Sequence, residues 1–178
     1  ALVSVASVGA MNAALNIVGV TNILYMALEN IVPIRATRIY MTDGVAGLNQ
    51  YLLKVAVLGG GITCTIGLIA CVWAENWMSL LYNNKFSGYE WIIYGWALYY
   101  FFGFFHRPLS IGLRVLHDTK GIFISNLLSP LLAISCGYWA IHNYELLGAL
   151  TILCMINFIV MLGLLLRYKI SIKYLAKR

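Results

Sequence analysis

The chain has 178 residues, of which 62% are hydrophobic and only 10% are charged, and its formal net charge is +6. Soluble domains carry about 25% charged residues, so this chain has too few to cover a soluble globule. The composition predicts an all-α membrane protein, a bundle of transmembrane helices in one domain over residues 1–178. It excludes nucleic-acid binding, because no basic soluble face is available.

The first predicted span, from about Asn12 to Thr37, is the most polar of five segments long enough to cross a bilayer. Steps of four and three residues follow one helical face. That face carries three asparagines, a glycine, a proline and a threonine: Asn12, Asn16, Gly19, Asn30, Pro33 and Thr37. Asn22 and Glu29 lie at its flank. Two interpretations stay open: hydrogen bonds between helices, or a water-filled cavity, which the neighbouring acid favours.

The second predicted span runs from about Tyr51 to Trp77 and contains three consecutive glycines, residues 59–61. Such glycines either allow helices to approach closely or act as a hinge, and close packing is the commoner case. A polar turn follows the span. Aromatic residues flank this turn as an interfacial belt: Trp73, Trp77, Tyr82, Tyr89 and Trp91.

The third predicted span, from about Trp91 to Leu116, contains the second charge expected inside the membrane, Arg107. At 1.5 Å per residue, Arg107 lies about 17–20 Å above the turn at 118–121, and Glu29 lies about 21 Å above the turn at 42–44. Because these depths are similar, we hypothesise that Glu29 and Arg107 face a shared cavity, as an ion pair. The alternative for Arg107 is snorkelling to the interface.

The fourth and fifth predicted spans cover about residues 122–141 and 146–166, with "HNYE" as the turn between them. A basic cytoplasmic tail follows at 167–178. Three of the spans contain a proline, which removes a helical hydrogen bond and introduces a kink. We therefore predict hinges at Pro33, Pro108 and Pro130.

The basic residues predict how the spans are oriented, because Lys and Arg accumulate on the cytoplasmic side. Only Lys85 lies in the turn after the second span, and the turn after the fourth has none. The other turns and the tail carry most of the basic residues: Arg35, Arg38, Lys54, Arg107, Arg114, Lys120, Arg167, Lys169, Lys173, Lys177 and Arg178. Five spans with the N-terminus outside and the C-terminus inside satisfy this pattern.

Catalytic and metal-binding patterns are not found in the sequence. The four cysteines form no C-x-x-C pair and read as small buried hydrophobic residues. The three histidines, His106, His117 and His142, have neither metal-ligand nor acid–base spacing. We therefore expect no enzyme activity, no metal and no cofactor.

Several stretches resemble one family of membrane transporters. "NIVGVTNILYMALENIVPIRATRIY" (16–40) and "DGVAGLNQYLLKV" (43–55) are similar to the eighth helix and following loop of polysaccharide-biosynthesis (Wzx-type) flippases, a branch of the MOP superfamily. Residues 77–132 and 145–166 are similar to the later helices of that family. The shared features are diffuse: an Asn…Pro kink, an outer turn with Asn and Gly, and a Leu-Gly-Ala helix start.

The resemblance implies helices 8–12 of a two-lobe transporter that works by alternating access. It implies a chain that lacks the N-terminal lobe and the seventh helix and does not transport alone. The implied function is to flip undecaprenyl-diphosphate-linked oligosaccharide across the bacterial inner membrane for surface polysaccharide (lipopolysaccharide, O-antigen) synthesis. The implied partners are that substrate, membrane lipids, the missing lobe, and the polysaccharide polymerase and glycosyltransferase machinery.

In this interpretation, different cavity residues would bind different parts of the substrate. Arg107 would bind the diphosphate, and asparagines would bind the sugars: Asn12, Asn16, Asn22 and Asn30. Glu29 would balance Arg107 or bind a coupling cation. The alternatives are a MATE-like multidrug antiporter, which Glu29 fits and Arg107 does not, and a membrane scaffold without transport activity.

Overall fold

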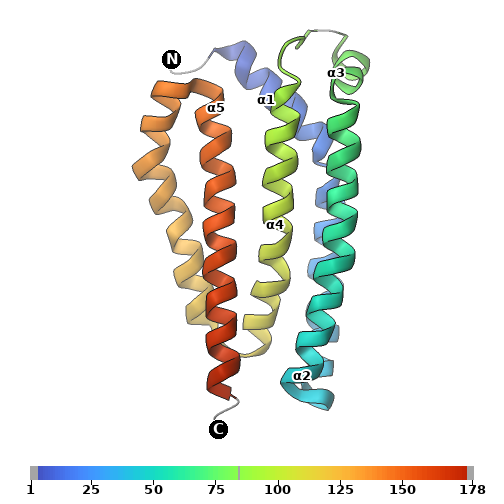
Figure 1. Ribbon diagram of the computed structural model, residues 1–178, viewed down its shortest axis with the longest axis vertical. Coiled ribbons are helices and arrows are strands. Elements are labelled where there is room, and N and C mark those ends of the chain that lie inside the picture. Colours follow the sequence, from blue (N-terminus) through green and yellow to red (C-terminus); the bar gives the residue numbers. More distant parts are fainter. Residues whose placement is uncertain (1–3, 84, 176–178) are drawn as a thin grey trace.

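The computed structural model describes residues 4–83 and 85–175, and in these ranges the chain is helical without β-strands, which confirms the all-α fold class. The described ranges contain five helices: α1 (Val5–Val18), α2 (Thr21–Val72), α3 (Ala74–Tyr82), α4 (Trp91–Val115) and α5 (Thr119–Leu175). Polar residues occupy the breaks before α4 and α5, whereas the breaks at Gly19 and Trp73 lie within apolar sequence. Figure 1 shows α2, α4 and α5 running along the long axis.

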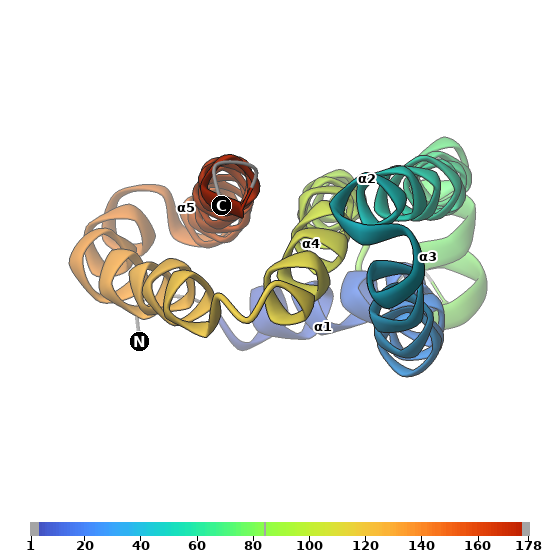
Figure 2. The same ribbon diagram turned by 90° about the horizontal axis from the view of Figure 1, so that it is seen from below.

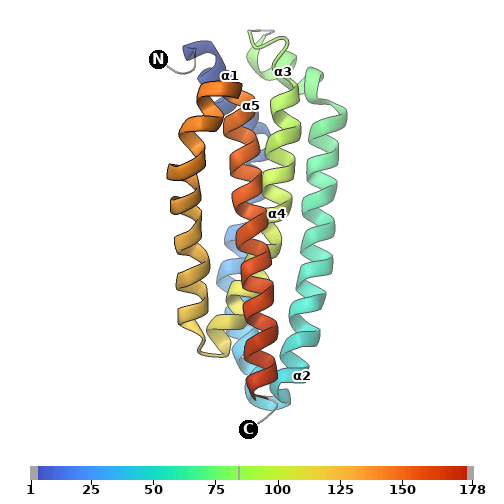
Figure 3. The ribbon, with the colours of Figure 1, turned by 60° about the vertical axis from the view of Figure 1, so that its left-hand side comes forward.

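Helices α2 and α5 each fold back on themselves to form a hairpin with two arms (Figures 1 and 3). The bend in α2 is at Gly44, with φ 67° and ψ −156°, and the bend in α5 is at Glu145, with φ 46° and ψ −122°. The first is a conformation that glycine adopts easily. We refer to residues 21–43 and 45–72 as the first and second arms of α2, and to 119–144 and 146–175 as those of α5.

Helix α4 occupies the middle of the bundle. Seen from below in Figure 2, α4 has the second arms of α2 and α5 on one side and their first arms on the other. Twelve of its 25 residues are buried, including Gly103, Phe104 and Gly112. The two hairpins therefore share α4 as their common packing partner.

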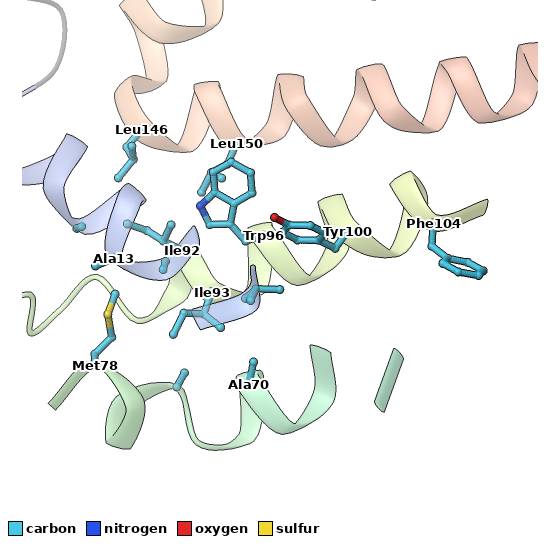
Figure 4. Packing of buried hydrophobic residues seen from close by; sticks show 14 of the residues in the cluster. Ala13, Ala70, Met78, Ile92, Ile93, Trp96, Tyr100, Phe104, Leu146 and Leu150 are labelled. Carbon is cyan, nitrogen blue, oxygen red and sulfur yellow. The ribbon is translucent and has the colours of Figure 1, made fainter. Parts of the chain in front are cut away.

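Two clusters of buried side chains form the core. The first joins α1, α3, α4 and the adjoining ends of α2 and α5, and it includes Met78, Ile92, Trp96 and Leu150 (Figure 4). The second lies toward the other end of the bundle, where Leu48, Leu113 and Leu164 from the three long helices are fully buried. Between these clusters, α2 and α4 meet along a polar face.

Two of the consecutive glycines in α2 allow α4 to approach closely. A Cβ atom at Gly59 would overlap the Phe104 ring, and one at Gly60 would lie 2.9 Å from Cζ of Phe105. A Cβ atom at Gly61 would meet nothing within 4 Å. Close packing, rather than a hinge, is therefore the role of Gly59 and Gly60.

The prediction of one continuous helix from Asn12 to Thr37 is wrong. Helix α1 ends at Val18, and α2 begins at Thr21. The Thr21 hydroxyl donates a hydrogen bond to the Val18 carbonyl at 2.8 Å, and Gly19 donates to the Leu15 carbonyl. This turn interrupts the helix between Val18 and Thr21.

The other predicted segments agree better with the structure. The third span is α4 almost residue for residue, and the turn at "HNYE" contains the bend at Glu145. The second span begins and ends earlier than predicted, because the helix continues directly from the bend at Gly44 and breaks at Trp73, where α3 follows. The three prolines lie inside α2, α4 and α5, and the non-helical backbone within α2 and α5 is at Gly44 and Glu145 instead.

Among the described helices, α2 and α5 are long and apolar enough to cross a membrane. This suggests membrane association. The number of crossings and their orientation remain predictions.

Candidate functional site

Polar side chains from α2 and α4 meet along the first arm of α2. Asn22, Tyr25 and Glu29 are spaced by three and four residues, so they lie on one helical face. The Nδ2 of Asn22 donates to the Tyr100 hydroxyl at 2.9 Å, and the Tyr25 hydroxyl donates to the Tyr100 backbone carbonyl. Helix α4 thus receives polar contacts from α2 over two turns.

The next contact along this face is an ion pair between Arg107 Nη1 and Glu29 Oε1, which confirms the pairing expected from their similar depths. The guanidinium also lies over the Tyr25 ring, with Cζ 4.1 Å from the ring centroid. The Arg107 side chain is 24% exposed and that of Glu29 is 56% exposed. The arginine is therefore held more tightly than its partner.

The ion pair opens into a polar recess of about 210 Å³ between the first arms of α2 and α5 and one side of α4. Its remaining lining includes Ser110, Arg114 and Asn126. With His106 neutral, two arginines face one glutamate, so the recess carries an excess of positive charge. Such a site favours an anion, and guanidinium groups bind phosphate oxygens particularly well.

Two polar atoms at the recess are buried without a partner. In the part of the chain that the structure describes, Ser110 Oγ and Arg107 Nε have no hydrogen-bond acceptor or donor. Ser110 is only 7% exposed. Leaving a buried polar group unpaired costs about 1–3 kcal/mol, so a ligand or water that supplies these hydrogen bonds would be stabilised here.

Not all of the predicted cavity residues come together. Asn12 and Asn16 lie on α1, exposed, and Asn16 Nδ2 is 3.4 Å from the Tyr82 hydroxyl. Asn30 is exposed on α2 and does not line the recess. All three asparagines of the predicted face are therefore exposed, whereas Asn22 and Glu29, placed at its flank, contact α4.

Several residues that line or support the site were not predicted as site residues from the sequence, among them Tyr25, Ser110, Arg114 and Asn126. Tyr25 is recoverable from its spacing to Asn22 and Glu29 once the helix is started at Thr21. Ser110 and Arg114 follow Arg107 at steps of three and seven on α4. Asn126 could not be predicted as a site residue from the sequence, because its position at the recess depends on how α5 packs against α4.

Comparisons of this chain with models of protein families, with curated proteins and with solved structures gave no match.

Proposed function

We propose that this protein is a multi-pass membrane transport protein of the polysaccharide flippase type, and that its recess binds the diphosphate of a lipid-linked oligosaccharide. The observation that carries the proposal is the Glu29–Arg107 pair beside Arg114 in a bundle that is otherwise strongly apolar. Charged residues inside membrane spans are rare and usually line the path of a substrate or an ion.

The charges of the recess fit an anionic headgroup better than a cation. A diphosphate can accept hydrogen bonds from both arginines and from the Ser110 hydroxyl, which has no hydrogen-bond partner among the described residues. Glu29 would neutralise Arg107 between substrates. A cation antiporter is less well supported, because the Glu29 carboxylate that a cationic drug would need is already paired with Arg107. A packing-only scaffold would not require buried polar atoms without partners.

The proposal includes five membrane crossings, with the N-terminus outside and the C-terminus in the cytoplasm of a bacterium. The bend at Gly44, the α4–α5 connection and the end of α5 lie at one end of the bundle, and α3, the start of α4 and the bend at Glu145 lie at the other (Figure 3). Basic residues gather near the first end, including Arg38, Lys120 and Lys173, which supports its assignment to the cytoplasm.

A binding experiment tests the proposal directly. The purified chain in nanodiscs of uncharged phospholipid would be titrated with an undecaprenyl-diphosphate oligosaccharide, and binding would be followed by native mass spectrometry. We expect Arg107→Gln to weaken binding about tenfold or more, the effect of losing a charge-assisted hydrogen bond. Arg107→Lys should retain part of the affinity, and Leu24→Ala should bind normally.

Equal binding by Arg107→Gln, Leu24→Ala and the unmodified chain would refute the assignment of the recess. In cells, export of the lipid-linked oligosaccharide by the complete transporter provides the second readout. Normal export by both Arg107→Gln and Glu29→Gln would refute the transport role of the pair.

A further inference from the structure

The opposite side of α4 carries a second, very different concavity. A groove of about 510 Å³ runs between the second arm of α2, α4 and the second arm of α5. Its walls are aliphatic and aromatic along most of its length, with Leu53, Val57 and Leu165 among them. Leu53 and Val57 are 65% and 64% exposed, so the groove is open to the surroundings of the bundle.

The groove is polar at one end only. There it is lined by Asn49, Tyr168 and Lys169, next to the end of the bundle where the basic residues gather. The Tyr168 hydroxyl donates to Asn49 Oδ1 at 2.6 Å, which leaves the Asn49 Nδ2 group as a free donor. In the described part of the chain, neither this group nor Lys169 Nζ has a side-chain acceptor.

The floor beneath this polar end is fixed by the packing of three helices. A Cβ atom at Gly112 of α4 would lie 2.6 Å from Cε2 of Tyr168 and 2.8 Å from Cδ1 of Leu52. The glycine thus lets Tyr168 and Leu52 approach α4, and Tyr168 is only 8% exposed. The polar end is therefore rigidly placed relative to the apolar walls.

The length and polarity of the groove match one kind of ligand. From Met161 to Ile172, the wall formed by α5 extends over about 16 Å at 1.5 Å per residue, close to the length of an extended acyl chain. A cation and an amide donor stand at the end that would lie at the cytoplasmic interface, where anionic lipids concentrate. The apolar walls lie at the depth of the hydrocarbon.

We propose that this groove binds one anionic glycerophospholipid, with an acyl chain along the apolar walls and the phosphate at Lys169 and Asn49. The site is distinct from the recess, because the groove is lined by the second arms of α2 and α5 and the recess by their first arms. Figure 2 shows these pairs of arms on opposite sides of α4. The proposal rests on the membrane location in the proposed function, but not on the identity of the transported substrate.

Native mass spectrometry of the full chain tests this site with two lipids of the same chain length, phosphatidylglycerol and phosphatidylcholine. We expect one retained phosphatidylglycerol at several-fold higher occupancy than phosphatidylcholine. Lys169→Gln should abolish this preference. Lys173→Gln, which removes a basic residue outside the groove lining on the same helix, should leave it unchanged.

A second pair of variants tests the apolar walls. Ala56→Phe fills the groove and should reduce retention of both lipids, whereas Ala133→Phe, on the exposed surface of the first arm of α5, should not. Equal retention of the two lipids, an equal effect of the two lysine variants, or normal retention by Ala56→Phe would each overturn the proposal.

These experiments distinguish failure of the diphosphate site in the recess from failure of the phospholipid site in the groove. Lys169→Gln should still bind the undecaprenyl-diphosphate oligosaccharide, and Arg107→Gln should still prefer phosphatidylglycerol. Loss of lipid preference in Arg107→Gln would place the phospholipid in the recess and contradict the groove site.

Discussion

At the scale of single residues, the two partners of the ion pair are not equivalent. Arg107 is 24% exposed and Glu29 is 56% exposed, so removing the carboxylate leaves the less accessible charge without its partner. An unpaired charge costs more the less solvent it reaches. We expect Glu29→Gln to lower the thermal midpoint of the empty protein more than Arg107→Gln does.

A double-mutant cycle on the same pair measures the coupling between them. Because Glu29 is more than half exposed, solvent screens the interaction, and we expect a coupling free energy of only about 1 kcal/mol. The measurement is thermal unfolding of the two single variants and the double variant in detergent micelles. Strictly additive effects would mean that the two side chains do not interact.

The consecutive glycines of α2 provide a matched comparison. A methyl group at Gly59 would overlap the Phe104 ring, whereas one at Gly61 would meet no neighbour. We expect Gly59→Ala to destabilise the fold by about 1–3 kcal/mol through overpacking. Gly61→Ala should be neutral or stabilise it by up to about 1 kcal/mol through helix propensity. Thermal unfolding checks both, and the reverse order would contradict the packing role of Gly59.

The sequence predicted site residues correctly where the chemistry of a single side chain was enough to identify them. Glu29 and Arg107 stood out because a charge in an apolar span requires a partner. The asparagine face is a different case, because helical spacing shows which residues share a surface and not whether that surface meets another helix. Asn12, Asn16 and Asn30 are all exposed, whereas Asn22 and Glu29 beside that face contact α4.

At the scale of elements, a polar cluster ties the α4–α5 connection to the last turns of α5. Asp118 accepts hydrogen bonds from Arg167 Nε at 2.7 Å and Nη2 at 3.2 Å, and from the Ser171 hydroxyl at 2.5 Å. The Gly121 backbone N–H adds a fourth at 3.1 Å. The hydrogen bonds from Arg167, together with the smaller contributions of Ser171 and Gly121, lower the pKa of Asp118 against the opposing effect of its burial.

This lowered pKa predicts a loss of stability in acid. The folded protein binds fewer protons at Asp118 than the unfolded chain, so the cluster stabilises the fold fully above the unfolded pKa of about 4. That contribution is lost as the pH falls through the lower, folded-state pKa. We expect the thermal midpoint to fall over this window, and to fall less in Asp118→Asn. An identical acid dependence in the variant would exclude Asp118 as its source.

The elements themselves were predicted unevenly, and the reason is physical. Apolar runs located α4 and the turn at "HNYE" well, because hydropathy reports which residues avoid water. It does not report whether the backbone is continuous. The turns at Gly19 and Trp73 occur within apolar sequence, so α1 and α3 could not be separated from their neighbours.

At the scale of the whole molecule, the proposed orientation predicts which residues a reagent can reach from each side. In a variant with all four cysteines replaced, a cysteine at Lys85 should react with a membrane-impermeant maleimide in intact cells. One at Lys120 should react only after the membrane is permeabilised. Labelling of both in intact cells, or in the reverse order, would contradict the proposed topology.

The overall architecture was predictable as a class but not as an arrangement. Composition alone indicated a helical bundle, since helices satisfy their own backbone hydrogen bonds in lipid. The central position of α4 was not predictable, because its glycines and aromatic residues fit many packing partners. Close approaches at positions such as Gly59 and Gly112 let α2 and α5 pack against it.

The position of Pro108 in α4 has a consequence for both proposed ligands. It follows Arg107 of the recess and lines the groove on the other side, and proline leaves the Phe104 carbonyl without its usual helical partner. A bend of α4 at this point would widen one site while narrowing the other. Occupancy of the two sites would then be negatively cooperative, and by reciprocity each ligand would weaken the other by the same factor.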